Sequence, residues 1–134
     1  MNVTITGATG LIGKGIVKAL RERGDEVTVL SRDPSGATAK LGIPAVAWNA
    51  TEEPAPAEAI RGRQAIVHLA GEPVAQRWTP STRTAIRDSR EAGTRNLVAA
   101  IAATDASERP AVPKRSSNSD FTAAISRLKT SCEA

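Results

Sequence analysis

The 134-residue chain contains no tyrosine and only three aromatic residues, Trp48, Trp78 and Phe121. Its core must therefore be built from Ala, Val, Ile and Leu, a composition that suits helices packed on a parallel sheet. Nucleic-acid-binding domains usually combine a basic stripe with stacking aromatics. Here the net charge is +4, and residues 1–110 mix 14 basic with 12 acidic side chains. The composition thus argues against a nucleic-acid partner.

Cysteine, histidine and long apolar runs are also scarce. Cys132 is the only cysteine, which excludes a disulfide framework and a cysteine-rich metal site. His68 is the only histidine and lies in an apolar stretch, so we expect a packed neutral imidazole and no metal site. No stretch approaches the ~18 apolar residues of a membrane helix, and no basic leader precedes the first apolar segment. We therefore predict a cytoplasmic protein without a membrane partner.

Hydrophobic periodicity predicts strands that alternate with helices. In the first helix Ile12, Ile16 and Leu20 recur at four-residue spacing with Val17 on the same face, and Gly24 follows as a left-handed cap. The predicted elements are strands over 2–6, 26–31, 44–48 and 64–70, helices over 11–23 and from Pro80 to about Thr104, a loop over 33–36, and at most a short helix ending at Arg61.

The second long helix is marked by Thr79, an N-cap residue, followed by Pro80 at the first helical position. Strands that alternate with helices imply parallel pairing and right-handed crossovers. The predicted fold is α/β: a partial Rossmann-type, doubly wound parallel sheet of about four strands with helices on both faces. The residues expected on the buried face of the second helix are Ile86, Gly93, Leu97 and Ile101.

The composition changes near the carboxyl end. Residues 113–134 are serine-rich, contain no convincing apolar strand and suggest at most a weak helix over 122–128. A doubly wound sheet would need its next buried strand at this point. We therefore expect a half-domain over 1–112, incomplete at its C-terminus, and an atypical tail over 113–134.

The segment TGATGLIG, residues 6–13, is the most informative motif. In a dinucleotide-binding turn, Gly7 would allow the tight turn, Gly10 the approach of a pyrophosphate, and Gly13 the close packing of helix on strand. The N–H groups of the first helical turn would then face the phosphates. An ordinary glycine-rich turn is the alternative, but the strand before the motif and the helix after it favour dinucleotide binding.

The end of the second predicted strand bears on the choice of cofactor. NAD-binding proteins usually place Asp or Glu there, whereas a basic residue suits the 2′-phosphate of NADP. This strand ends in Ser31 and Arg32, which favours NADP over NAD. Asp33 remains an alternative ribose ligand, and a solvated loop arginine remains the alternative interpretation of Arg32.

The TGxxGxxG spacing resembles that of extended and atypical short-chain dehydrogenases/reductases. The stretches VHLAGEPVAQRWTP (67–80) and IRDSREAGTRNLVAAI (86–101) narrow the resemblance to the NAD-dependent epimerase/dehydratase-like subgroup named "epimerase family protein". It covers residues 1 to about 112. The resemblance implies NADP binding through the glycine turn, the end of the second strand, the segment after the fourth strand and the long helix. The implied cofactor-binding residues are Gly7, Thr9, Gly10, Leu11, Ile12, Gly13, Ser31, Arg32, Leu69, Ala70, Gly71 and Arg90.

The chemistry of this superfamily needs a tyrosine that acts as general acid/base beside the nicotinamide. Because the chain has none, we assign no catalytic residue. We expect the NADP-binding portion of an epimerase or oxidoreductase, truncated or frameshifted before its catalytic part. A small-molecule substrate, for example one like a nucleotide sugar, is expected only in a full-length form. The subgroup that the chain resembles continues with a Gly-Tyr/Phe-Tyr-Gly motif. Suitable codons for residues 119–123, read in a shifted frame, encode Gly-Phe-Tyr-Gly at about this place. The alternative is a non-catalytic NADP-binding or regulatory module.

Overall fold

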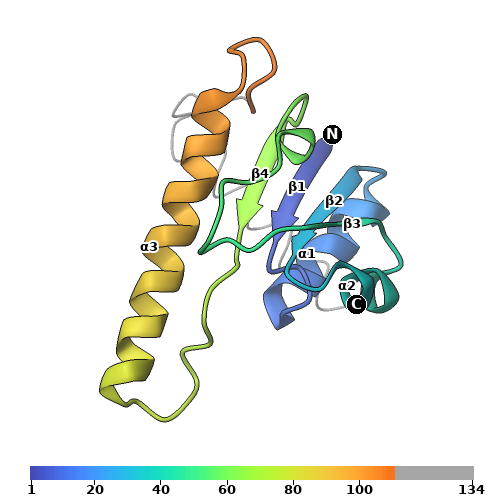
Figure 1. Ribbon diagram of the computed structural model, residues 1–134. Helices are drawn as coiled ribbons and strands as arrows, with labels where there is room; N and C mark the ends of the chain where they lie inside the picture. The colour runs from blue at the N-terminus through green and yellow to red at the C-terminus, as the bar shows by residue number, and fades with distance from the viewer. Residues whose placement is uncertain (111–134) are drawn as a thin grey trace, which may run out of the picture.

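A computed structural model describes residues 1–110 of the chain. Within them, strands and helices alternate, and the four predicted strands and the helices that follow the first and fourth of them are present (Figure 1). The elements are β1 (Asn2–Thr6), α1 (Leu11–Glu22), β2 (Glu26–Ser31), α2 (Pro34–Leu41), β3 (Ala45–Ala47), a short 3-10 helix (Ala57–Ala59), β4 (Ala65–His68) and α3 (Pro80–Ala103). The predicted domain boundary at residue 112 and the weak helix over 122–128 lie outside the described residues.

The four strands form one parallel sheet in the order β3-β2-β1-β4. The chain moves outward from β1 to β3, then crosses back to place β4 on the other side of β1. The strand order therefore reverses between β1 and β4, the point at which open α/β sheets bind ligands. This arrangement confirms the predicted α/β fold of the partial Rossmann type.

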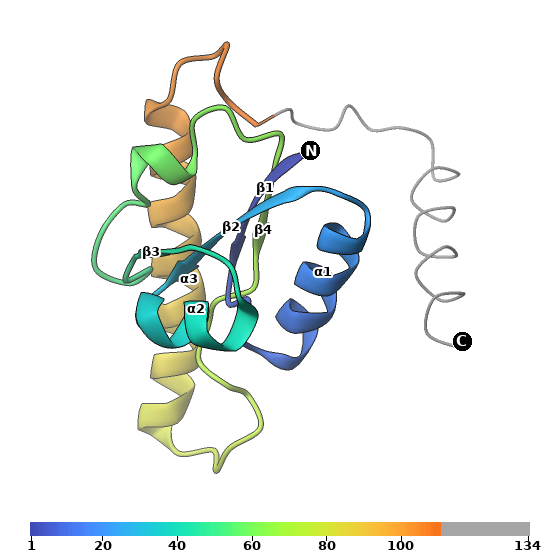
Figure 2. The ribbon, with the colours of Figure 1, turned by 90° about the vertical axis from the view of Figure 1, so that its right-hand side faces the viewer.

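Successive residues of each strand point to opposite faces of the sheet, and two apolar clusters result. Val29 packs with α1 and α2 on one face, whereas its neighbour Leu30 packs with α3 and the 3-10 helix on the other. Figure 2 shows α1 and α3 on opposite sides of the strands. Leu97 and Gly93 are buried on α3, as the helical spacing predicts.

Two details of the prediction are wrong. The loop expected over 33–36 begins helix α2, because Asp33 accepts a hydrogen bond from Gly36 N at 2.9 Å as its N-cap, and Pro34 occupies the first turn. Asp, Pro, Ser and Gly suit a turn and a helix start equally, so composition alone could not separate them. Ile12 does not join the buried face of α1. It is 68% exposed, since Gly13 and Val17 face the sheet.

Candidate functional site

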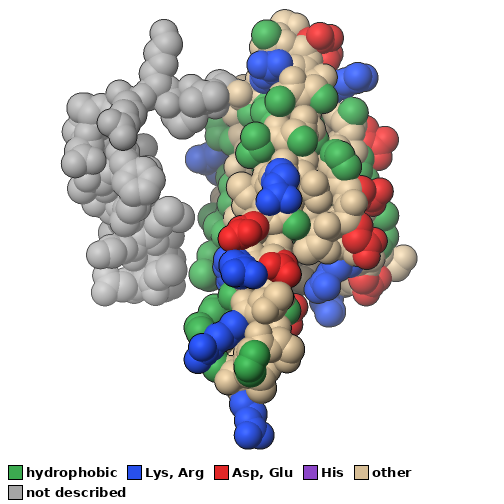
Figure 3. Space-filling view, turned by 60° about the vertical axis from the view of Figure 1, so that its left-hand side comes forward, with side chains coloured by type: hydrophobic (Ala, Val, Ile, Leu, Met, Phe, Trp, Pro, Cys, Tyr) green, Lys and Arg blue, Asp and Glu red, His purple; other side chains and the backbone are tan. Residues whose placement is uncertain are grey.

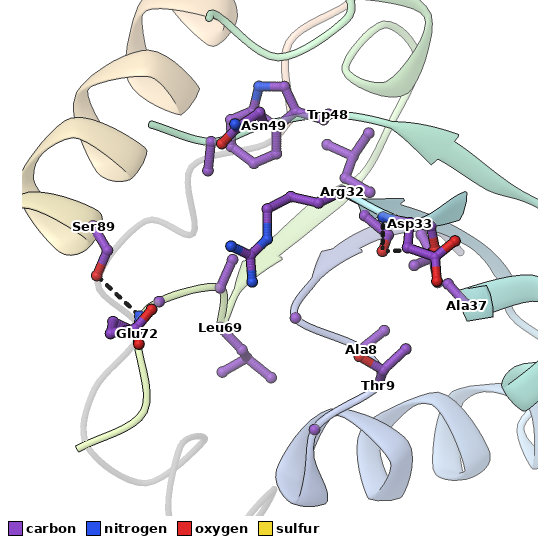
Figure 4. A pocket seen from close by; sticks show the side chains of 18 of the residues that line it. Ala8, Thr9, Arg32, Asp33, Ala37, Trp48, Asn49, Leu69, Glu72 and Ser89 are labelled. Carbon is purple, nitrogen blue, oxygen red and sulfur yellow. Dashed lines mark hydrogen bonds between the residues drawn. The ribbon is translucent and has the colours of Figure 1, made fainter. Parts of the chain in front are cut away.

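A cavity of about 730 Å³ lies at the carboxyl ends of the four strands. Its lining comes from the segments that follow β1, β2, β3 and β4, and from α2 and α3 (Figure 4). Parallel strands present the same end to one edge of the sheet, so residues distant in sequence meet there. The cavity occupies the place at which the strand order reverses, the usual ligand site of open α/β sheets.

Gly7 brings the turn after β1 against the segment after β4. Its φ of +69° is a conformation that L side chains rarely adopt, and a Cβ there would lie 2.7 Å from the carbonyl carbon of Leu69. A side chain at Gly13 would collide with the Gly7 carbonyl oxygen and with the backbone of Ala8. Both glycines therefore permit close backbone approach, as the motif predicts.

The amino end of α1 adjoins this turn. Gly10 is its N-cap and lines the cavity, and Gly10 N donates to Gly7 O at 3.1 Å. The first N–H groups of an α-helix have no partner inside the helix, and the helix dipole makes this end positive. Leu11 and Ile12 are 93% and 68% exposed and do not line the cavity. What this end of α1 can offer to an anion is therefore its backbone N–H groups and not these side chains.

The end of β2 places a cation in the cavity. Arg32 lines the cavity and points into it, away from Asp33 and towards Leu69 (Figure 4). No carboxylate among residues 1–110 forms an ion pair with it. Asp33 caps α2 through one carboxylate oxygen, and its backbone N–H donates to Ser31 Oγ at 3.1 Å. Arg32 is thus the cation at the end of β2, and Lys40 of α2 is a second cation in the cavity lining.

Leu69, Ala70 and Gly71 follow β4 and line the opposite side of the cavity. Thr6, at the end of β1, is fully buried, and its Oγ1 accepts from the N–H groups of Leu69 and Ala70, both at 3.1 Å. The backbone after β4 is thus held at two successive positions by a side chain of β1.

The Ser89–Arg90 pair ties α3 to the loop after β4. Ser89 Oγ accepts from Glu72 N at 2.9 Å, and Arg90 Nη1 donates to Glu72 O at 3.2 Å. Ser89 lines the cavity, whereas Arg90 does not and lies against Gly71. Arg90 thus supports the cavity wall from behind. Figure 3 shows the amino end of α3 projecting beyond the body of the molecule.

His68 is packed under the site, as expected. Its Nδ1 lies 2.7 Å from Thr6 Oγ1, and its ring centroid lies 6.2 Å from that of Trp48. Burial lowers the pKa of His68 from its ordinary value, because the charged form loses hydration. A neutral imidazole is therefore the stable form. Among residues 1–110 no group of three or more His, Cys, Asp or Glu side chains could hold a metal ion.

The structure brings most of the predicted site residues to one cavity. Thr9 and Gly10 lie beside the turn, and the residues after β2 and β4 face them. Sequence reasoning missed the segment after β3, although the rule that ligands bind at the carboxyl ends of strands pointed to it. The predicted residues that line the cavity are Gly7, Thr9, Gly10, Ser31, Arg32, Leu69, Ala70 and Gly71; the missed ones include Trp48, Asn49, Ala50, Thr51, Gly36, Ala37, Lys40 and Ser89.

The chain is similar in sequence to known proteins that are named epimerase family proteins. An "Epimerase family protein SDR39U1 homolog, chloroplastic" from Arabidopsis thaliana is 36% identical over 115 residues, covering 84% of this chain and 33% of that protein. The epimerase family protein YfhF of Bacillus subtilis is 32% identical over 97 residues, covering 72% and 31%. The chain spans about a third of the length of these relatives. Since one of them is named chloroplastic, the family does not imply a cytoplasmic location.

Solved structures agree with this assignment. Human epimerase family protein SDR39U1 with NADPH is 30% identical, with a TM-score of 0.61, over 78% of this chain and 32% of that one. A short-chain dehydrogenase/reductase superfamily protein from Agrobacterium tumefaciens with bound NAD is also 30% identical, with a TM-score of 0.58, over 75% and 28%. Within residues 1–110, no helix has the length and apolar character needed to span a bilayer.

One family model covers most of the chain. The model of the NAD dependent epimerase/dehydratase family matches residues 3–116, which include the glycine turn, all four strands and the long helix. The strand order and the cavity described above are those of a dinucleotide-binding fold. The chain therefore belongs to the NAD-dependent epimerase/dehydratase family.

Proposed function

We propose that the chain binds NADP(H) in the cavity at the carboxyl ends of its strands, as the cofactor-binding part of an epimerase or oxidoreductase. The pyrophosphate would lie on the turn between β1 and α1, where Gly7 and Gly10 allow close approach and the first N–H groups of α1 are free for an anion. The adenosine end would then lie towards β2 and α2, and the nicotinamide end towards the segment after β4.

Arg32 is the observation that carries the preference for NADP over NAD. Its guanidinium points into the cavity from the position at which NAD-binding proteins usually present a carboxylate (Figure 4). It has no ion-pair partner among the described residues, and Asp33, the nearest carboxylate in sequence, is used to cap α2. A 2′-phosphate would supply an anion to pair with Arg32, and the Ser31 hydroxyl, which donates to Asp33 O at 3.1 Å in this structure, would turn to donate to it.

The ligands of the relatives support a nicotinamide dinucleotide and include both forms. The human structure contains NADPH and the Agrobacterium tumefaciens structure contains NAD. The choice for this chain therefore depends on its own residues. Ser31 and Arg32 favour NADP, because an uncompensated cation is an advantage only when the ligand carries the extra phosphate.

Titration of the purified chain with NADPH and NADH tests this proposal. We expect NADPH to bind more tightly, and Arg32→Ala to remove most of the difference by weakening NADPH about ten- to a hundredfold, the worth of one charge-assisted contact. Arg83→Ala, which removes an exposed arginine of α3 outside the cavity lining, is the matched control. Equal affinities of the unmodified chain for both cofactors would refute the preference, and no binding of either would refute the function.

We further infer that the 134 residues bind the cofactor without turning it over. The superfamily uses a tyrosine to transfer the proton that accompanies hydride transfer, and this chain has none. A positioned cofactor without a proton donor lacks a term worth about 10²–10⁴ in rate. NADPH consumption by the purified chain with a panel of carbonyl compounds would contradict this inference.

A further inference from the structure

The hydroxyl of Thr6 is a junction between the cofactor cavity and the single histidine of the chain. Its Oγ1 accepts from Leu69 N and Ala70 N, both at 3.1 Å, and lies 2.7 Å from His68 Nδ1. Leu69 and Ala70 line the cavity, whereas neither Thr6 nor His68 does. A buried side chain therefore connects the cavity wall to a titratable ring behind it.

Counting protons at this junction determines the tautomer of His68. A hydroxyl has two acceptor lone pairs and one proton to donate. Leu69 N, which also donates to Thr6 O at 3.2 Å, and Ala70 N use both lone pairs of Thr6 Oγ1, so we assign the contact with His68 as a donation from Thr6 to Nδ1. Nδ1 is then the unprotonated ring nitrogen, and the ring proton resides on Nε2.

The surroundings of His68 offer no partner to a charged ring. The Nε2 atom is buried with no hydrogen-bond partner among the described residues, next to Gly93 of α3 and Ala50 of the segment after β3. Trp48 packs from the same segment, and no ion pair among residues 1–110 includes His68. The nearest charged side chains along α3 are all exposed: Arg90, Glu91 and Arg95. Burial alone lowers the pKa of the ring.

Protonation would make Nδ1 a third donor towards Thr6 Oγ1, whose two lone pairs are already used. Either the Thr6 hydroxyl gives up one of the N–H groups of Leu69 and Ala70, or the imidazolium turns away and remains unpaired. An unpaired buried charge is costly, so the backbone after β4 would move first. That backbone is one wall of the cavity, and Gly7 packs directly against it.

We propose that His68 is a positioning residue for the cofactor: by accepting the Thr6 proton it keeps the Thr6 hydroxyl available to Leu69 N and Ala70 N, and it does this only while neutral. This inference rests on the proposed NADP(H) site. Cofactor binding and protonation of His68 then oppose each other. NADPH affinity falls in acid by up to about tenfold per pH unit below the pKa of His68 in the free protein.

The key variant is His68→Asn, whose Oδ1 stands near the place of Nδ1 and accepts a hydrogen bond without titrating. We expect its NADPH affinity at about pH 7.5 to stay within about threefold of the unmodified chain's. As the pH falls from about 7.5 through the pKa of His68, which lies below its ordinary value, the unmodified chain should lose affinity relative to His68→Asn. The ratio of the NADPH affinities of the two proteins cancels the effect of titrating the 2′-phosphate itself, because both proteins bind the same ligand.

A second pair of variants tests the junction from the Thr6 side. Thr6→Ser keeps the hydroxyl and should bind NADPH like the unmodified chain. Thr6→Val has nearly the same shape, leaves Ala70 N without its acceptor and Leu69 N with Thr6 O alone, and should weaken NADPH binding at every pH. Urea unfolding of both variants, with NADPH at a concentration far below its dissociation constant, separates a loss of affinity from a loss of folding.

Nuclear magnetic resonance of the untagged chain gives a direct reading, because its imidazole signals come from one histidine. We expect the Nε2–H tautomer at neutral pH, with and without NADPH, and a lower His68 pKa when NADPH is bound. The Nδ1–H tautomer, or identical pH profiles of NADPH affinity in the unmodified chain and His68→Asn, would overturn the positioning role while leaving cofactor binding intact. Absence of NADPH binding at about pH 7.5 would instead overturn the proposed function, and this role with it.

Discussion

Gly7 and Gly62 offer a matched pair of substitutions that isolates the close approach within the cofactor turn. Their φ angles are +69° and +65°, so alanine meets the same backbone strain at both positions. A Cβ at Gly7 would lie 2.7 Å from the carbonyl carbon of Leu69 and 2.8 Å from Ala70 N, whereas a Cβ at Gly62 would have no atom within 4 Å. The two variants therefore differ mainly in one backbone collision.

The expected magnitudes follow from this geometry. A left-handed conformation costs an L residue roughly 1–2 kcal/mol, and both variants carry that cost. The smaller conformational freedom of the unfolded alanine chain also applies to both and cancels in the comparison. Gly7→Ala must in addition separate two backbone segments that cannot rotate away as a side chain would. Overpacking of this kind costs about 1–3 kcal/mol, so Gly7→Ala should exceed Gly62→Ala by that amount.

Urea unfolding and NADPH titration together measure the effect. Gly62→Ala should lose stability only by the cost of its backbone strain, and it should keep its NADPH affinity, since Gly62 does not line the cavity. Gly7→Ala should lose more stability and most of its affinity, because the collision moves the turn away from the segment after β4. If the two variants have equal free energies of unfolding, or if Gly7→Ala binds NADPH normally, then the close approach has no energetic role.

Three further predictions concern stability and ligand binding. Burial lowers the pKa of His68 in the folded state, while its pKa in the unfolded chain is about 6.5. The free energy of unfolding should therefore be constant above about pH 6.5 and fall below it by at most ~1.4 kcal/mol per pH unit. Urea midpoints measured across this pH range should show the slope, and His68→Asn should lack it. Ser89→Ala removes the acceptor of Glu72 N and should lower the free energy of unfolding in urea by about 1 kcal/mol. Thr94→Ala, an exposed change on the same helix, should not. Equal losses would argue against a stabilising bond between Ser89 and Glu72. NADPH at a hundred times its dissociation constant should stabilise the fold by about 2.7 kcal/mol, and an unchanged melting temperature would contradict binding to the folded state.

Local pattern was sufficient for most of the secondary structure and for part of the site. The spacing of apolar residues predicted α3 and its buried Leu97, and Thr79 followed by Pro80 predicted where α3 begins. It failed where one composition suits two structures. The segment from Asp33 to Gly36 reads as a loop, yet it starts α2, because Ala37 can bury itself against the core once Asp33 caps the helix.

The sequence alone determined the class of ligand, because three glycines at TGxxGxxG spacing between a strand and a helix act through their own local backbone. The end of β2 is similarly local, so Arg32 could be proposed as the phosphate partner before any fold was known. The periodicity of the strands also predicted a parallel sheet, since strands separated by helices must cross over in one direction.

Only the tertiary structure decided which distant residues act together. Arg90, which we expect to reach the cofactor, bonds in the described structure to Glu72 O, a contact that the sequence did not indicate. The link from Thr6 to His68 joins residues 62 positions apart, and it exists because β1 and β4 pair in parallel with Thr6 beside His68. Pairing register is a property of the assembled sheet, so no local pattern could have indicated that the one histidine of the chain lies behind the cofactor turn.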